Sequence, residues 1–156
     1  MRYTPGQLRD LVGLSQETLR HWRTTLPPLQ GSRGRAPYFT AGQVLGTATV
    51  KAVIDEFGLP VRSLRAASSS LFAICSQPNW EALGAGHLAI VLRTGDVTLL
   101  KQGDLADLSC PTILFPLSPV IEKLRTALLG ASGDQTALSF PPVSIARAPR
   151  ASRSVR

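Results

Sequence analysis

The sequence predicts an α+β fold, in which a helical N-terminal segment precedes a small segment with a β-hairpin and one amphipathic helix. Three observations lead to this prediction. Apolar residues recur at helical spacing, between capping residues, through the first 67 positions. Two β-rich runs then meet at a Thr-Gly-Asp turn at residues 94–96. A second helical stripe of apolar residues follows at positions 119–129.

The first two helices are expected to be short and closely spaced. Thr4 is a preferred N-cap residue and Pro5 suits the first helical position. Gly13 would end this helix after about two turns. Ser15 can cap a second helix at once, so only a turn of about three residues separates the two. A helix, a short glycine-containing turn and a second helix form the helix-turn-helix pattern.

The second helix has one apolar and one polar face. Leu19 and Trp22 lie three positions apart and are expected to face inward, against the first helix. The opposite face carries long polar side chains that could reach base edges or phosphates. These are Gln16, Glu17, Arg20, His21 and Arg23.

A basic loop and a longer helix come next. The loop at 30–37 contains glycine and carries Arg33 and Arg35. Thr40 is an N-cap residue for a helix expected over 41–57, which Gly58 and Pro60 would end. A fourth helix is expected from Val61 to about Cys75, although Ser68, Ser69 and Ser70 could instead mark a domain junction.

In the second segment, the pattern of apolar residues changes from helical spacing to the period of two that is typical of β-strands. Residues 87–93 and 97–101 are expected to pair as a β-hairpin, with 112–115 as a third strand. A helix to Leu129 should follow, with Ser118 as its N-cap, Glu122 in its first turn and Gly130 at its end.

The charge divides the chain into three parts. The 156 residues have a net charge of +7 and a pI near 10.4, which favours a polyanionic partner. Residues 1–67 carry nine basic and four acidic side chains, a net of +5. Residues 68–130 have a net of −1 and residues 131–156 a net of +3. We expect a basic N-terminal domain, a near-neutral second domain and a disordered basic tail, with these boundaries.

Several classes of protein are not expected. No apolar run approaches the roughly 18 residues of a membrane span, and the N-terminus lacks a signal-peptide core, so a cytoplasmic location is expected. Cys75 and Cys110 form neither a disulfide framework nor a spaced metal set. No catalytic motif and no phosphate-cradling glycine loop is present, so we expect neither an enzyme nor a cofactor.

The first 65 residues resemble the DNA-binding domain of MerR-type transcriptional regulators. The resemblance lies in the order and distance of short motifs rather than in any one of them. The matching residues are Tyr3-Thr4-Pro5-Gly6-Gln7-Leu8, Val12-Gly13-Leu14-Ser15, Thr18-Leu19-Arg20-His21-Trp22, Arg33-Gly34-Arg35, Tyr38-Phe39-Thr40 and Phe57-Gly58-Leu59-Pro60-Val61.

The resemblance implies a winged helix-turn-helix whose second helix enters the major groove of duplex DNA. It also implies a homodimer on a pseudo-palindromic site, and RNA polymerase is a further candidate partner. The DNA-binding residues it implies are Ser15, Gln16, Thr18, Arg20, His21, Arg23, Arg33, Arg35 and Tyr38.

The sequence departs from the family pattern in two places. The loop reads Gly34-Arg35-Ala36-Pro37-Tyr38, where family members usually have Gly-Tyr-Arg-x-Tyr. No long helix for an antiparallel coiled coil follows the first domain, so the second domain would supply dimerisation, effector binding, or both.

Three alternatives remain beside a transcriptional regulator. An excision or architectural factor of the phage or plasmid type would use the same winged fold to bend DNA. A protein–protein adaptor would dock its helices on a partner and bind no duplex. An enzyme with its site in the second segment is the third, and no residue constellation supports it.

Overall fold

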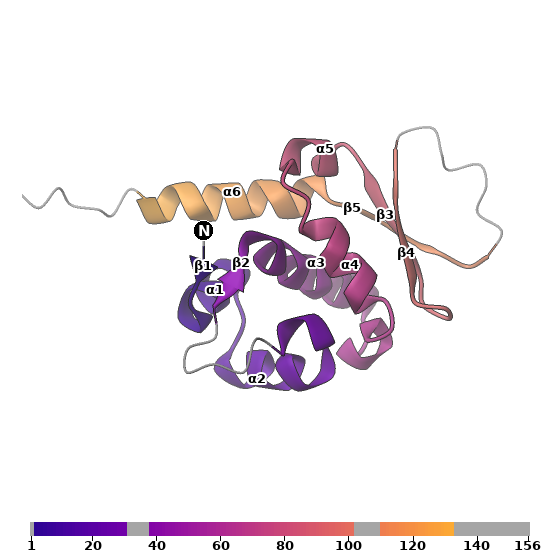
Figure 1. Ribbon diagram of the computed structural model, residues 1–156, viewed down its shortest axis with the longest axis horizontal. Coiled ribbons are helices and arrows are strands. Elements are labelled where there is room, and N and C mark those ends of the chain that lie inside the picture. Colours follow the sequence, from indigo (N-terminus) through magenta and orange to yellow (C-terminus); the bar gives the residue numbers. More distant parts are fainter. Residues whose placement is uncertain (1, 31–37, 102–109, 133–156) are drawn as a thin grey trace, which may run out of the picture.

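The computed structural model describes residues 2–30, 38–101 and 110–132, and it has a mixed α+β fold (Figure 1). Helices make up most of the described chain, and two small antiparallel sheets accompany them. Within these residues no helix is both long and apolar enough to cross a bilayer. The expected α+β class is confirmed.

The first two helices form as predicted. α1 spans Pro5–Val12 and α2 spans Gln16–Thr25. Thr4 caps α1 in a reciprocal arrangement, because its hydroxyl accepts from the Gln7 backbone N–H while the Gln7 side chain accepts from the Thr4 N–H. Gly13 ends α1 with a positive φ of 73°, a conformation that favours glycine.

The region between α2 and the third helix contains a pairing that the sequence does not indicate. The short 3-10 helix η1 covers Pro27–Leu29, and strand β2 covers Phe39–Thr40. β2 pairs antiparallel with β1, Arg2–Tyr3, near the start of the chain. This two-stranded ribbon joins segments that are almost 40 residues apart.

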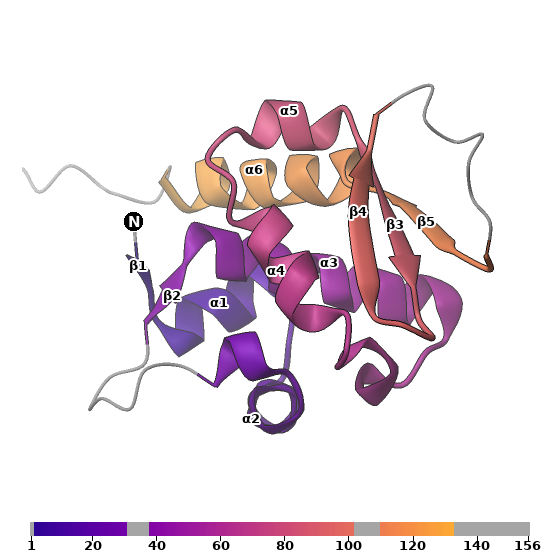
Figure 2. The same ribbon diagram turned by 45° about the vertical axis from the view of Figure 1, so that its right-hand side comes forward.

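α3, Ala41–Phe57, has the predicted bounds and the predicted caps. The Thr40 hydroxyl accepts from the Gln43 N–H, and Gly58 follows the last turn. The helix is central to the fold, since α1, α4 and α6 all pack against it (Figure 2). α4 approaches closely at Gly46, where a Cβ would lie 2.7 Å from the Phe72 ring.

The prediction of a single helix over residues 61–75 is wrong. The structure has a 3-10 helix, η2, over Val61–Leu64. The α-helix α4 begins only at Ser68 and spans Ser68–Cys75. The interruption has a local cause, because the Ser68 hydroxyl donates to the Arg65 carbonyl at 2.7 Å and competes with the regular helical pattern. A further helix, α5 at Trp80–Gly84, was not predicted, although Asn79 caps it.

The second sheet confirms the predicted hairpin and third strand. β3 spans His87–Val91, β4 spans Asp96–Leu100 and β5 spans Ile113–Pro116. β3 lies in the middle and pairs antiparallel with both neighbours.

The last helix, α6, is longer than predicted and spans Ser118–Ser132. Ser118 is its first residue rather than its N-cap, because the Ile121 N–H already donates to the Leu117 carbonyl at 3.0 Å. The helix continues through Gly130, which was expected to end it, and Glu122 lies beyond its first turn. Val120, Ile121 and Leu124 are buried, as their spacing predicts.

One hydrophobic cluster includes buried side chains from both of the expected domains, from Tyr3 to Leu124. α6 contributes to it by packing on α1, α3 and α5. The two segments on either side of residue 67 bury their apolar faces against each other. A domain boundary at residue 67 stays a prediction. The disordered basic tail was expected to begin at residue 131, but α6 includes Ala131 and Ser132, and residues 133–156 lie outside the described residues.

Candidate nucleic-acid interface

The start of α2 is fixed by two hydroxyl side chains. The Ser15 Oγ accepts from the Thr18 N–H at 3.0 Å and lies 2.8 Å from the Thr18 Oγ1. Ser15 is exposed and Thr18 is half-buried. Ser15 therefore caps the N-terminus of α2, and the Thr18 hydroxyl is held beside the cap.

The inner face of α2 is apolar, as predicted. Leu19 and Trp22 keep only 4% and 5% of their surface exposed and belong to the hydrophobic cluster. Trp22 is thus a core residue. Burial of this face leaves the polar side chains of α2 on the outside of the molecule.

Five polar residues of α2 are exposed: Gln16, Glu17, Arg20, His21 and Thr24. Arg20 forms no ion pair or hydrogen bond with another described residue, so its guanidinium is available to a ligand. Gln16 is held from α1, because the Arg9 Nη1 donates to its side-chain oxygen at 3.4 Å. That contact links the two helices across their turn.

Arg23 has a different environment from Arg20. It is half-buried, and its Nε donates to the Leu29 carbonyl of η1 at 3.4 Å. η1 is in turn tied to α3, since the Gln43 Nε2 donates to the Pro28 carbonyl at 2.8 Å. Arg23 therefore joins α2 to η1, whereas the sequence placed it on the outer face.

The β1–β2 ribbon supplies two exposed side chains. Tyr38, immediately before β2, keeps 52% of its surface exposed. Arg2 is exposed on β1 and pairs in register with Thr40. Arg2 was not among the residues predicted from the sequence. The predicted loop residues Arg33 and Arg35 lie outside the described residues.

η2 and its C-cap residue bring two further basic residues to the interface, and neither was predicted from the sequence. Arg62 and Arg65 are exposed, and η2 packs directly against α2. Both elements lie on the lower side of the molecule in Figures 1 and 2, opposite α6. Their spacing of three, just after the Gly58–Pro60 turn, is the signal that could have indicated them.

The charge of this surface is predominantly positive. Arg20, Arg62 and Arg65 are exposed without an acidic partner among the described residues, and Glu17 is the one acidic residue on α2. The ion pair of Lys51 with Asp55 lies apart from it, within α3. A polar helix bordered by unpaired guanidinium groups can accept a polyanion.

The two cysteines differ in their exposure to solvent. Cys75 is buried, and burial raises its thiol pKa to about 12, against a smaller opposite effect of a hydrogen bond with Thr49. Cys110 is exposed. Among the residues described, His, Cys, Asp and Glu form no group of three or more that could hold a metal ion.

Comparison of the chain with family models, with curated proteins and with solved structures gives no match. The functional conclusion therefore depends on the residues and geometry of the chain itself.

Proposed function

We propose that the protein is a sequence-specific duplex-DNA-binding transcriptional regulator with a MerR-like winged helix-turn-helix at its N-terminus. The observation that carries the proposal is α2, whose apolar face is buried while its polar face is exposed beside Arg62 and Arg65. Such a helix can lie in the major groove while the flanking guanidinium groups bind phosphates.

In this proposal Gln16 and Arg20 contact base edges or the nearest phosphates, and His21 and Arg23 lie beside them. Ser15 and Thr18 orient the helix and support backbone contacts. Tyr38 and the loop residues Arg33 and Arg35 hold the adjacent phosphates.

Arg2, Arg62 and Arg65 extend the phosphate contacts on either side of α2. With Z phosphate contacts, log affinity falls against log salt with a slope of about −0.9Z.

The proposal includes a homodimer, which would place two α2 helices in successive major grooves. The natural partner of such a dimer is a pseudo-palindromic operator near a promoter, where RNA polymerase is the further candidate partner.

The test is the selection of bound duplexes from a random pool by the full chain. A symmetric enriched sequence supports a dimeric, sequence-specific regulator. Enrichment without symmetry, together with strong bending of tandem sites, favours an architectural factor. If no duplex is retained even at low salt, the proposal is wrong and a protein–protein adaptor becomes the better explanation.

A further inference from the structure

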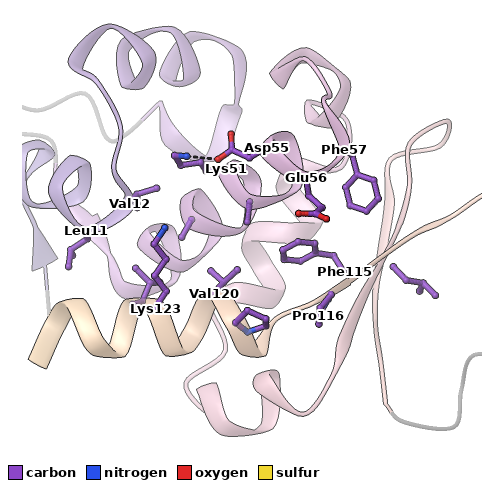
Figure 3. A pocket seen from close by; sticks show the side chains of 15 residues that line it. Leu11, Val12, Lys51, Asp55, Glu56, Phe57, Phe115, Pro116, Val120 and Lys123 are labelled. Carbon is purple, nitrogen blue, oxygen red and sulfur yellow. Dashed lines mark hydrogen bonds and ion pairs between the residues drawn. The ribbon is translucent and has the colours of Figure 1, made fainter.

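A groove lies on the other side of α3 from α4, between the N-terminal helices and the C-terminal elements. Its walls come from α1, α3, β5 and α6, and its volume is about 540 Å³ (Figure 3). This volume is within the range of roughly 300–1,000 Å³ that small-molecule sites occupy. The groove is separate from the α2 surface described above.

The lining of the groove is mostly apolar and partly open to solvent. Ala52 from α3, Val120 from α6 and Phe115 from β5 all line it. Phe57 and Leu114, which also line it, keep 43% and 36% of their surface exposed. Large apolar side chains that remain exposed in a concave site indicate a surface that an apolar ligand would cover.

The charged residues of the lining differ between the two ends of the groove. Lys51, Asp55 and Lys123 lie toward α1, and Glu56 lies toward Phe57 and Phe115 (Figure 3). Asp55 neutralises Lys51 through their ion pair, whereas Lys123 has no acidic partner among the described residues. The end toward α1 therefore has a net charge of +1, and the aromatic end has a net charge of −1.

We propose that this groove binds a small amphipathic molecule with an aromatic or aliphatic body and one anionic group. The anionic group pairs with Lys123 at the end toward α1, and the body covers Phe115 and Phe57. Glu56 repels the reverse orientation. The positive net charge of the chain also favours an anion over a cation.

The position of the groove gives such a ligand a route to α2. Leu11 and Val12, at the end of α1, line the groove, and only Gly13, Leu14 and Ser15 separate them from α2. A ligand wedged between α1 and α6 would shift α1, and α2 would move with it. This coupling rests on the proposed function, whereas ligand binding itself does not.

The binding test uses the fluorescent probe 8-anilinonaphthalene-1-sulfonate and its neutral analogue N-phenyl-1-naphthylamine, which lacks the sulfonate. The full chain should bind the anionic probe at one site per molecule, and more tightly than the neutral one. Lys123→Gln should weaken binding of the anionic probe about fivefold and leave the neutral probe within about twofold, since the lost pair is a partly exposed one. Arg93→Gln, which removes a charge outside the groove, serves as the control.

A second variant tests the place of binding. Ala52→Phe should fill the groove and abolish binding of both probes, while circular dichroism shows that the chain still folds. If Ala52→Phe does not fold, Leu114→Asp, which places a negative charge on the exposed rim, takes its place and should weaken binding of both probes. The proposal is overturned by equal affinity for both probes, by unchanged binding in the filled variant, or by binding that is lost as protein concentration rises. The last result would mean that a second copy covers the groove.

The coupling is measured with a selected duplex, with and without saturating anionic probe. Wild-type affinity for the duplex should change at least threefold, and that of Lys123→Gln should change less at the same probe concentration. Duplex affinity that is the same with and without bound probe overturns the coupling. Failure to bind any duplex would instead contradict the proposed function, and the probe measurements without DNA distinguish the two.

Discussion

Gly95 in the β3–β4 turn lies directly against Ala66, so that a Cβ on Gly95 would be 2.7 Å from the Ala66 Cβ and 2.8 Å from its carbonyl carbon. Ala66 belongs to the turn between η2 and α4. The contact holds the C-terminal sheet against the same segment that presents Arg62 and Arg65 to the α2 surface. The second half of the chain thereby supports the candidate interface without belonging to it.

Gly95→Ala should destabilise the protein more than Gly58→Ala. Both glycines have a positive φ, of 78° and 63°, so each alanine costs about 1–2 kcal/mol of backbone strain. Gly58 has open space around its Cα, whereas Gly95 meets backbone atoms of Ala66, and overpacking adds about 1–3 kcal/mol. Urea unfolding of the two variants checks this, and equal losses of stability would contradict the contact.

Substitutions of Ser15 should separate folding from DNA binding. Ser15→Ala should cost about 1 kcal/mol, because the Thr18 N–H loses its acceptor. Asn and Asp are both good N-caps, so Ser15→Asn and Ser15→Asp should keep the stability of the wild type. Only Ser15→Asp adds a negative charge at the end of α2 that would approach DNA.

Duplex binding by the asparagine variant should therefore stay close to wild type, and binding by the aspartate variant should fall. Filter binding measures the affinity for duplex, and thermal unfolding measures the stability independently. If both capping variants bound duplex equally well, the start of α2 would not be close to phosphates.

Arg20→Gln should weaken duplex binding by about tenfold and make the salt slope shallower by about 0.9, because one guanidinium contact is lost. Lys123→Gln is the matched control, since it removes the same charge from α6 on the opposite side of the molecule. Its affinity for duplex should stay within about twofold of wild type. Equal losses in the two variants would mean that net charge, rather than α2, determines binding.

The two thiols should react at very different rates. At pH 8, Ellman's reagent should modify Cys110 rapidly and Cys75 only after the addition of denaturant, because burial raises the pKa of Cys75 to about 12. Cys110→Ser should then show no fast-reacting thiol. A fast reaction of both thiols in the native protein would show that Cys75 is accessible.

The same thiol makes stability depend on alkaline pH. In the unfolded chain Cys75 ionises near its ordinary pKa of 9.0, whereas in the folded chain it keeps its proton to about pH 12. Its contribution to stability is therefore complete below pH 9 and is lost as the pH rises from about 9 toward 12. The loss should approach about 1.4 kcal/mol per pH unit within this window. Unfolding of the wild type and of Cys75→Ala as a function of pH measures it.

The local elements of the fold could be predicted because their signals lie within three or four residues of one another. Thr4, Ser15 and Thr40 cap helices through hydrogen bonds to residues three positions ahead, and Gly13 and Gly58 end helices by their own backbone conformation. The same locality explains the error at 61–75, where the Ser68 side chain altered a helix that apolar spacing alone would continue.

The candidate site could be predicted only where it coincides with a single element. The helical spacing of the apolar residues in α2 predicts that Arg20 lies on its exposed face. Arg62 joins Arg20 only because η2 packs on α2. This contact brings together residues that are far apart along the chain, and no short-range spacing encodes it.

The sequence by itself determined the α+β class, the capped helices, the hairpin and the polar face of α2, because hydrogen bonds and apolar period are properties of neighbouring residues. Only the tertiary structure decided that Arg23 is tied to η1, that Arg62 and Arg65 lie on a segment packed against α2, and that α1, α3, β5 and α6 together line a groove. The physical reason is that burial of one shared core, and not local propensity, fixes how these elements lie against one another.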